Sequence, residues 1–292
     1  MLSLHTNIAA LYAQSAANLA QAQLSTSMLR LSTGFRINSA MDDAAGLQIA
    51  TRLRAQVSGM TVAMRNSQNS TSMLQTAEGA FGEVSNMLIR MKDLATQAAD
   101  ASSSQADRGA MQSEYDALGA ELYNIVTNTT YGGDLLLGNG SGAAKGKLSA
   151  VMTFQIGASS SETMQLDLAG DMAGLDTALK AVTANFAATG SAGSEISSGS
   201  GANATIALLA AAIDRVGGVR SALGATGNRL GHVYNNLSNM VVNTRAAMGR
   251  IMDVDYAAES ANMASAQMRL QASVAMIRQN RNMAQLILSL LQ

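Results

Sequence analysis

The sequence predicts a mainly α fold, in which long antiparallel helices from both ends of the chain pair with each other and a small β-hairpin region lies in the middle. Three observations carry this prediction. The 292 residues include no proline, so only glycine is available to interrupt helices. Aromatic residues make up only 3%, so the core must be built from Ala, Leu, Ile, Val and 19 Met, which suit helix interfaces. Apolar residues also repeat every 3.5 residues over long stretches of both halves, the spacing of coiled-coil seams.

The N-terminal half contains three predicted helices. The first has an apolar stripe at Leu4, Ile8, Leu11 and Leu19, opposite a face of uncharged Gln, Asn and Ser. The second has a seven-residue repeat, made of Ala77, Val84, Met91 and Ala98 with Leu74, Phe81, Leu88 and Leu94 or Ala95 between them. Small polar residues at 97–109 predict a loop, and the 3-4 spacing from Met111 to Thr129 predicts a third helix that packs back on the second.

The middle of the chain, residues 131–205, changes composition, with glycine- and serine-rich loops predicted at "YGGDLLLGNGSGAAKGK", 131–147, and "ATGSAGSEISSGSGANAT", 188–205. Within it, "VMTFQIG" at 151–157 and "ETMQLDL" at 162–168 alternate between apolar and polar residues. This pattern predicts two short strands around the turn "ASSS".

The C-terminal half has the longest seam. It steps by sevens from Leu209 through Val216, Leu223, Leu230 and Leu237 to Ile251. The last helix repeats at Met263, Leu270, Ile277, Ala284 and Leu291, helped by Val274 and Leu288, and its only charges after Glu259 are Arg269, Arg278 and Arg281. Because a solvated helix normally carries charge on its outer face, we expect both terminal helices to be covered on more than one side.

The stretch "LSTGFRINSAMDDAAGLQIATRL", residues 31–53, has two adjacent carboxylates among arginines and glycines. On a helix the side chains of Asp42 and Asp43 would point about 100° apart, so they could not act as an acid and base on one substrate. The favoured interpretation is a turn followed by a helix start, with Asn38 or Ser39 as the N-cap and the carboxylates in the first turns.

No other motif predicts an enzyme, a cofactor or a metal site. The only histidines are His5 and His232, which lack the HExxH spacing, and there is no cysteine. The glycine-rich "GNGSGAAKGK" at 138–147 fails both phosphate-binding patterns and is interpreted as a loop. The methionines, at helical spacing, are interpreted as core filler.

Charge and hydropathy exclude two classes of partner. A net charge of −1 favours neither nucleic acid nor an anionic membrane. The longest apolar run, "IALLAAAI" at 206–213, is much shorter than the roughly 20 residues of a membrane span. The first 29 residues have no charged side chain and so no basic n-region of a Sec signal, which leaves a cytosolic protein or export by another route.

These residues resemble bacterial flagellin. Residues 31–46 match the family signature L-S-[ST]-G-x-R-I-N-S-A-x-D-D-A-A-G, and the likeness continues in "LQTAEGAF", "DLATQAAD", "FQIGA", "LGATGNRL", "DVDYAAESANM" and the terminal "LSLLQ". The resemblance covers about 1–170 and 206–292. The family often has a proline in its last ten residues and this chain has none, so we expect a more continuous terminal helix.

The resemblance implies a layered subunit of the flagellar filament. Residues 1–45 and 251–292 would form the inner core, 46–170 and 206–250 a helical rod with its hairpin near 150–168, and 171–205 a short variable outer segment, as in a reduced flagellin with little or no outer domain. Residues 31–53 would be the joint between core and rod, where Gly34 permits the turn. The residues expected to pack within and between subunits are Arg36, Asp42, Asp43, Arg52, Arg54, Leu270, Ile277, Leu288 and Leu291.

The resemblance also implies partners and a location. The main partner would be the chain itself, in a helical filament used for motility. Unfolded export through the flagellar type III apparatus would place it outside the cell, an export chaperone would bind about 251–292, and hook-associated and cap proteins would contact the filament. The flagellin-sensing Toll-like receptor would bind positions matching Arg90, Leu94, Gln97 and Glu114.

The sequence leaves two alternative functions open. One is a hook–filament junction protein, which shares the terminal coiled-coil pattern but assembles in limited copy number. The other is an enzyme carried in the middle segment. The unmatched stretch is short and the sequence has no metal-ligand cluster, and both observations disfavour an enzyme.

Overall fold

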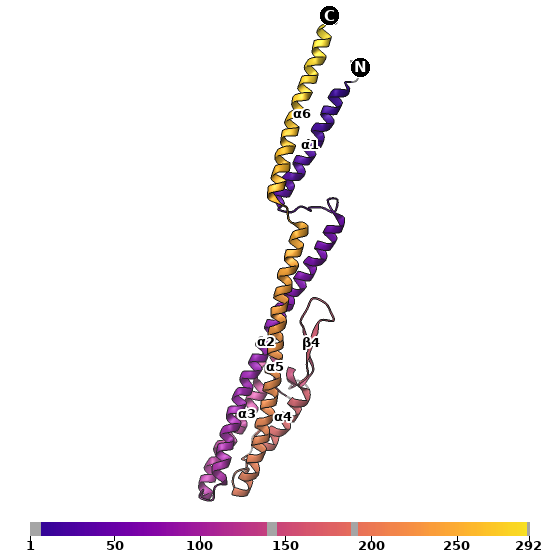
Figure 1. The fold of residues 1–292 in the computed structure, drawn as a ribbon. Helices are drawn as coiled ribbons and strands as arrows, with labels where there is room; N and C mark the ends of the chain where they lie inside the picture. Colours follow the sequence, from indigo (N-terminus) through magenta and orange to yellow (C-terminus); the bar gives the residue numbers. More distant parts are fainter. Residues whose placement is uncertain (1–6, 139–144, 188–191, 291–292) are drawn as a thin grey trace. The chain divides into compact units, whose positions relative to one another are not determined.

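The computed structural model describes residues 7–138, 145–187 and 192–290, without the side chains of 284–290 (Figure 1). The chain divides into two compact units. The terminal unit comprises Met1–Val57 and Val242–Gln292, and the central unit comprises Ser58–Val241.

Six helices and two small antiparallel hairpins make up the described secondary structure apart from a 3₁₀ turn at Lys147–Ser149, which confirms the mainly α prediction. The helices are α1 (Ile8–Thr33), α2 (Ala44–Ala99), α3 (Gln105–Asn128), α4 (Ala169–Val182), α5 (Gly199–Met252) and α6 (Tyr256–Leu290). The strands are β1 (Thr130–Tyr131), β2 (Asp134–Leu135), β3 (Met152–Gln155) and β4 (Thr163–Leu166).

The core of the central unit lies where α2, α3, α4 and α5 meet. The predicted seam residues of α2 are buried from Leu74 to Ala98, and those of α5 are buried at Leu209, Val216, Leu223, Leu230 and Leu237. Truncating a buried Leu of this kind to Ala would cost about 2–5 kcal/mol. The 3.5-residue spacing therefore identified the correct faces of both long helices.

The connection between α2 and α3 is shorter than predicted. It covers residues 100–104 rather than 97–109, because α2 continues to Ala99 and α3 begins early, at Gln105. A capping box explains the early start: the Ser104 side chain accepts from the Asp107 amide, and the Asp107 carboxylate accepts from the Ser104 amide.

The β3–β4 hairpin has the predicted strands and turn, with Met152 opposite Leu166 and Gln155 opposite Thr163. Its turn reaches α2 at a glycine: a Cβ on Gly59 would lie 2.7 Å from the Ala158 Cβ. The smaller β1–β2 hairpin was not predicted. Its turn residues Gly132 and Gly133 both have positive φ, the conformation of a two-residue type I′ turn.

Much of the segment 171–205, expected as a short variable outer segment, packs in the core of the central unit, and the helix within it was not predicted. Helix α4 occupies 169–182 and buries Met172, Leu175, Leu179 and Val182. These positions follow the i, i+3, i+7, i+10 spacing of an amphipathic helix, a signal that was present in the sequence. Helix α5 also begins at Gly199, before the expected start of the C-terminal helical region.

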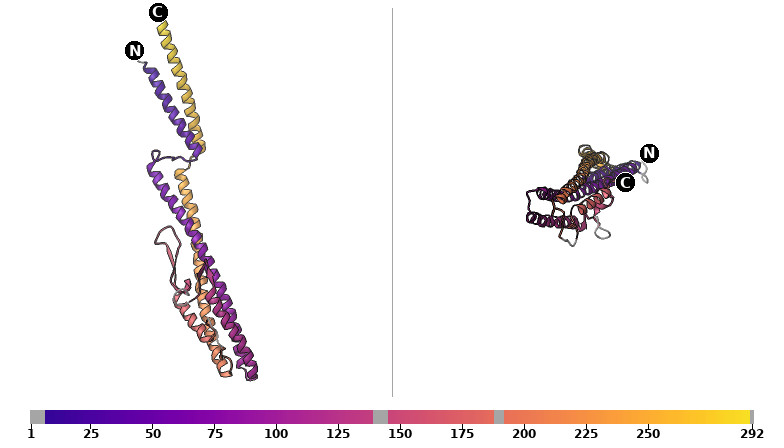
Figure 2. Two further views of the ribbon diagram at one scale, coloured as in Figure 1. Left: turned by 180° about the vertical axis from the view of Figure 1, so that it is seen from behind. Right: turned by 90° about the horizontal axis from the view of Figure 1, so that it is seen from below.

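In the terminal unit α1 and α6 lie side by side and antiparallel, as Figure 1 and the left view of Figure 2 show. Helix α6 is continuous from Tyr256 to Leu290, as the missing proline predicted. Within the described part of the chain, none of the helices has the length and hydropathy required to cross a membrane. The predicted division into filament layers concerns the assembled polymer and stays a prediction.

Candidate assembly surface and joint

The joint expected at residues 31–53 begins with a glycine turn. Gly34 caps the C-terminus of α1 with φ 76°, in the left-handed region, and its amide donates to the Arg30 carbonyl. A Cβ there would lie 3.0 Å from the Tyr256 hydroxyl. The left-handed conformation therefore favours glycine, and a Cβ would be in tight contact with Tyr256, which confirms the predicted turn at this position.

Two connecting segments run side by side after this turn. Phe35 and Asp253 form an antiparallel bridge, in which the Arg36 amide donates to the Met252 carbonyl at 2.6 Å and the Val254 amide donates to the Gly34 carbonyl at 3.0 Å. The Arg36 guanidinium adds a third bond, from Nη2 to the Ile251 carbonyl at 2.8 Å. The α1–α2 and α5–α6 connections are thus joined to each other.

Asp42 organises the turn that follows. Its Oδ2 accepts from the amides of Asn38 and Ser39 at 3.0 and 2.8 Å and from the Ser39 hydroxyl at 3.2 Å. These bonds, with the Ser39 amide foremost, hold the pKa of Asp42 below its ordinary value. The Asp42 carboxylate is therefore a structural acceptor in a local turn.

Asp43 is the residue that caps α2. It immediately precedes Ala44, and its Oδ1 accepts from the Gly46 amide at 2.8 Å. The prediction of Asn38 or Ser39 as the N-cap was wrong, because the Asp42 turn places the helix start several residues later. The two carboxylates thus serve different backbone amides, and they do not converge on a common site.

The other predicted packing residues are distributed differently. Arg52 and Arg54 are exposed, and neither makes a hydrogen bond or ion pair with another described residue. Leu270 and Ile277 are half-buried on α6. The Leu288 side chain and all of Leu291 lie outside the described residues, so they stay predictions.

Large apolar side chains are exposed along both terminal helices. On α1 they are Ile8, Leu11, Tyr12, Leu19, Met28 and Leu29; on α6 they are Tyr256, Met268, Val274, Met276 and Met283. Tyr12 is 73% exposed and Met268 is 65% exposed. A surface with this many apolar side chains and few charges is typical of an interface between proteins.

One polar pair is buried between these helices. The Ser27 hydroxyl donates to Glu259 Oε1 at 2.6 Å, and Arg30 Nη1 lies 3.6 Å from Glu259 Oε2. A groove of about 360 Å³ beside the pair is lined by Gln23, Thr26, Asn262 and Arg269. The pair was not predicted from the sequence, although Arg30 is the first charged residue of the chain and Glu259 is the last acidic one.

The residues matched to receptor contacts lie in the central unit. Arg90 and Glu114 form an exposed ion pair, with Arg90 Nη2 2.6 Å and Nε 2.8 Å from Glu114 Oε1, and Gln97 is also exposed. Leu94 differs, because it is only 3% exposed and packs in the core. Leu94 is therefore not on the surface that the other three residues share.

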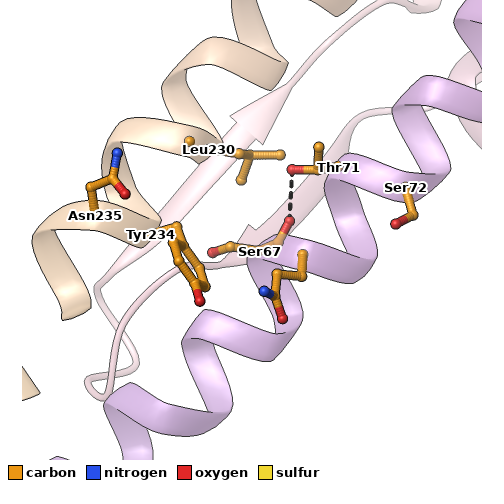
Figure 3. A pocket seen from close by; sticks show the side chains of 8 residues that line it. Ser67, Thr71, Ser72, Leu230, Tyr234 and Asn235 are labelled. Atoms are coloured by element: carbon orange, nitrogen blue, oxygen red, sulfur yellow. Dashed lines mark hydrogen bonds between the residues drawn. The ribbon is translucent and has the colours of Figure 1, made fainter.

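A second groove lies between α2 and α5, with a volume of about 470 Å³ (Figure 3). Ser67, Thr71 and Ser72 line it from α2, and Leu230 and Tyr234 from α5. The Thr71 hydroxyl donates to the Ser67 carbonyl at 2.9 Å, so it serves its own helix. This lining holds no acid, base or nucleophile arranged for catalysis.

The described residues include no group of three or more His, Cys, Asp or Glu side chains able to hold a metal ion. His232 is exposed on α5, and His5 lies outside the described residues. The distinctive features of the described chain are thus the paired helices α1 and α6, a joint whose two connections are hydrogen-bonded to each other, and an exposed apolar surface.

Comparison with known proteins identifies the family. The family model of the bacterial flagellin N-terminal helical region matches residues 4–141, and that of the C-terminal helical region matches residues 206–291. Polar flagellin F of Vibrio parahaemolyticus is 33% identical over 99% of both chains. The chain belongs to the bacterial flagellin family. Flagellin A of Vibrio anguillarum is 32% identical over the whole of both chains.

This flagellin is shorter than these relatives. The alignment with polar flagellin F has 387 positions against the 292 residues of this chain, so at least 95 positions, the difference, have no residue here. The family models leave residues 142–205 unmatched. A Vibrio parahaemolyticus structure assigned as a flagellar hook-associated protein shares the fold, with 17% identity and a TM-score of 0.55 over 73% of this chain and 100% of its own.

Flagellins are structural proteins that assemble into the flagellar filament, and this family is not one of enzymes. The hook–filament junction alternative is disfavoured, because the full-length matches are to flagellins, whereas the hook-associated structure shares only the fold. The chain is accordingly a filament subunit whose principal partner is another copy of itself.

Proposed function

We propose that the terminal unit supplies the contacts that hold the filament core together. The supporting observation is the row of exposed apolar side chains on α1 and α6. Burying one Leu, Met or Ile fully is worth about 1.5–3 kcal/mol. Several such side chains covered by neighbouring copies would offset the entropy lost when a subunit joins the filament. Because these contacts are head-to-tail, growth continues without closure.

The test is seeded growth of full-length protein beside two truncations, one lacking residues 1–30 and one lacking 260–292. Electron microscopy should show long filaments from the full chain only, while circular dichroism shows that the central unit remains folded in both truncations. Growth of both truncations at the rate of the full chain would contradict the proposal. Full-length protein that only caps the seeds would instead support a junction role.

The predicted packing residues of the joint belong to the same proposal. Arg36 already binds two carbonyls of its own chain, whereas Arg52 and Arg54 are exposed and available to a neighbouring subunit. Exchanging Arg52 and Arg54 for Gln should slow seeded growth and leave unfolding of the free subunit unchanged. Unaltered growth would remove both residues from the interface.

We propose that residues 251–292 also bind the export chaperone before assembly. The support is again the apolar exposure of α6, which needs cover in the cytosol as well as in the filament. Deleting 260–292 should abolish co-purification with the flagellar export chaperone, whereas deleting 1–30 should not. Retained co-purification after the C-terminal deletion would contradict this assignment.

The proposed receptor surface is reduced to Arg90, Gln97 and Glu114. Each is exposed, and the Arg90–Glu114 pair presents both charges on neighbouring helices of the central unit. Arg90→Ala should lower activation of receptor-expressing reporter cells by soluble subunits. Lys180→Ala, which also breaks an exposed ion pair, serves as the control and should not lower it.

We further propose that the filament lies outside the cell, with hook-associated and cap proteins at its ends. Family membership supports this placement. Immunogold labelling of intact cells should decorate external filaments, and labelling confined to permeabilised cells would contradict it.

A further inference from the structure

The buried contact between α1 and α6 consists of small and polar residues. In the described parts of these helices the buried residues are Ala20, Ser27, Glu259 and Ala266, exposed by 2, 5, 7 and 2%. The bulky apolar side chains of both helices are half-buried or exposed. Two alanines let the helices approach but hardly distinguish one turn of the partner from the next.

Glu259 does distinguish between turns. Its Oε1 accepts from the Ser27 hydroxyl at 2.6 Å, and its Oε2 lies 3.6 Å from Arg30 Nη1. A slip of one turn moves the helices by about 5.4 Å, which would carry the Glu259 carboxylate beyond reach of the Ser27 donor. A buried carboxylate without a donor is strongly unfavourable, so a slip that moves Glu259 away from both Ser27 and Arg30 is penalised.

The contacts among Ser27, Arg30 and Glu259 are poorly optimised for stability. The Arg30–Glu259 distance is long for an ion pair, and Arg30 Nε is buried without a hydrogen-bond partner. Replacing buried ionic groups by apolar ones is often neutral or stabilising, whereas a polar group in a helix seam can fix register at a cost in stability. The contacts therefore favour a role in register.

We propose that Ser27, Arg30 and Glu259, the Glu259 cluster, set the register of α1 against α6. The proposal rests on the proposed function of the terminal unit in assembly, because register decides how the exposed apolar side chains of the two helices combine into one surface. A second contact has the same antiparallel order: Arg269 Nη1 donates to Gln23 Oε1 at 3.3 Å, with Gln23 before Ser27 and Arg269 after Glu259.

Register can be measured directly in the full-length chain. The sequence contains no cysteine, so two substitutions, Gln14→Cys and Asn262→Cys, create the only two attachment sites for spin labels. Both positions are exposed, one on α1 and one on α6. Double electron–electron resonance then reports their separation in seeded filaments diluted with unlabelled protein. A one-turn slip alters the axial separation by about 5.4 Å.

The expected result is one narrow distance distribution in the parent protein and a broadened or split one in Glu259→Leu and in Ser27→Ala. The exchange Ser27→Glu with Glu259→Ser keeps the pair and should restore the narrow distribution, which a merely apolar or steric role would not do. The matched control is Arg278→Gln, which removes an exposed charge from the same helix and should leave the distribution unchanged.

A narrow, unshifted distribution in Glu259→Leu would overturn the proposal. If the parent protein fails to extend seeds, the assembly function is at fault, and the same comparison in unassembled chains still decides the register role. Absence of a narrow distribution in the parent protein in both states would also overturn it.

Discussion

Tyr115 shows at the residue scale how one hydroxyl fastens two helices. Its ring is buried on α3, and its hydroxyl donates to the Val182 carbonyl, the last residue of α4, at 2.8 Å. Burial, followed by the negative charges of Glu195 and Asp116, raises the pKa of Tyr115 far above its ordinary value. The side chain therefore stays neutral in the folded protein at any ordinary pH.

Stability should consequently depend on Tyr115 in alkali. Below about pH 10 the Tyr115 side chain is neutral in both the folded and the unfolded protein. Above that pH the unfolded chain releases a proton that the folded chain retains. The free energy of unfolding therefore falls by up to about 1.4 kcal/mol per pH unit. Urea unfolding from pH 8 to 11 should show a weaker decline in Tyr115→Phe than in the parent. Equal slopes would contradict this assignment. At neutral pH the variant should lose about 1–3 kcal/mol, because the Val182 carbonyl loses its donor.

The sequence predicted residue roles well where a role depends on immediate neighbours. Gly34 is the turn glycine that the joint requires, and Asp42 and Asp43 are structural carboxylates. The N-cap was misplaced because Asn38, Ser39 and Asp43 are all good capping residues, and the choice depends on the bonds of Asp42. The Ser27–Glu259 contact could not be predicted from local pattern, because 232 residues separate its members.

At the scale of the element, α5 and α3 contain glycines in opposite environments. A Cβ on Gly218 of α5 would meet nothing within 4 Å, whereas one on Gly119 of α3 would lie 2.7 Å from Thr183 Oγ1 and 3.2 Å from the Asn185 Cβ. Gly119 therefore permits the segment after α4 to pack closely against α3. Gly218 has no such role in the subunit.

These two glycines make a matched pair of substitutions. Gly218→Ala should stabilise the central unit by about 0.5–1 kcal/mol, because alanine has the higher helix propensity and meets no clash. Gly119→Ala should destabilise it by about 1–3 kcal/mol through overpacking. Urea unfolding followed by circular dichroism measures both, and a shift of the same sign in the two variants would contradict the packing described.

Element prediction succeeded where the pattern was long. The heptads of α2 and α5 extend over many turns, so chance matches hardly affect them. Helix α4 was missed because its 14 residues lie between glycine- and serine-rich segments whose composition dominated the interpretation. The structural role of Glu195 was not predicted for another reason. Its carboxylate accepts a hydrogen bond from Gln112 Nε2 at 2.8 Å, and 83 positions separate these two residues in the sequence.

At the scale of the whole molecule, the charge of the chain is unevenly divided. The terminal unit has nine arginines and five carboxylates, a formal charge of +4; the central unit has ten basic and fifteen acidic residues, a formal charge of −5. The net charge of −1 is their sum. Every basic residue of the terminal unit is thus an arginine, and most of them are exposed.

Limited trypsin digestion of free subunits should therefore remove the terminal helices first. Cleavage requires local opening, which costs least where few side chains are buried. Cuts after Arg54 and Arg245 would leave a fragment containing the central unit, Ser58–Val241, identifiable by mass spectrometry. In assembled filaments the same sites should resist cleavage. Equal digestion of both units, or of filaments and free subunits, would contradict this expectation.

The hydrogen bonds between the α1–α2 and α5–α6 connections have a mechanical consequence. Two separate connections, each with a few rotatable bonds, would act as two independent swivels. Here the two connections are joined by the bridge between Phe35 and Asp253. The Arg36 amide donates to the Met252 carbonyl, and the Val254 amide donates to the Gly34 carbonyl, so the connections form a short two-stranded ribbon. Because the two connections are hydrogen-bonded to each other, neither can rotate about its own backbone bonds without moving the other. The end of α1 and the start of α6 are therefore expected to move together at this joint rather than separately.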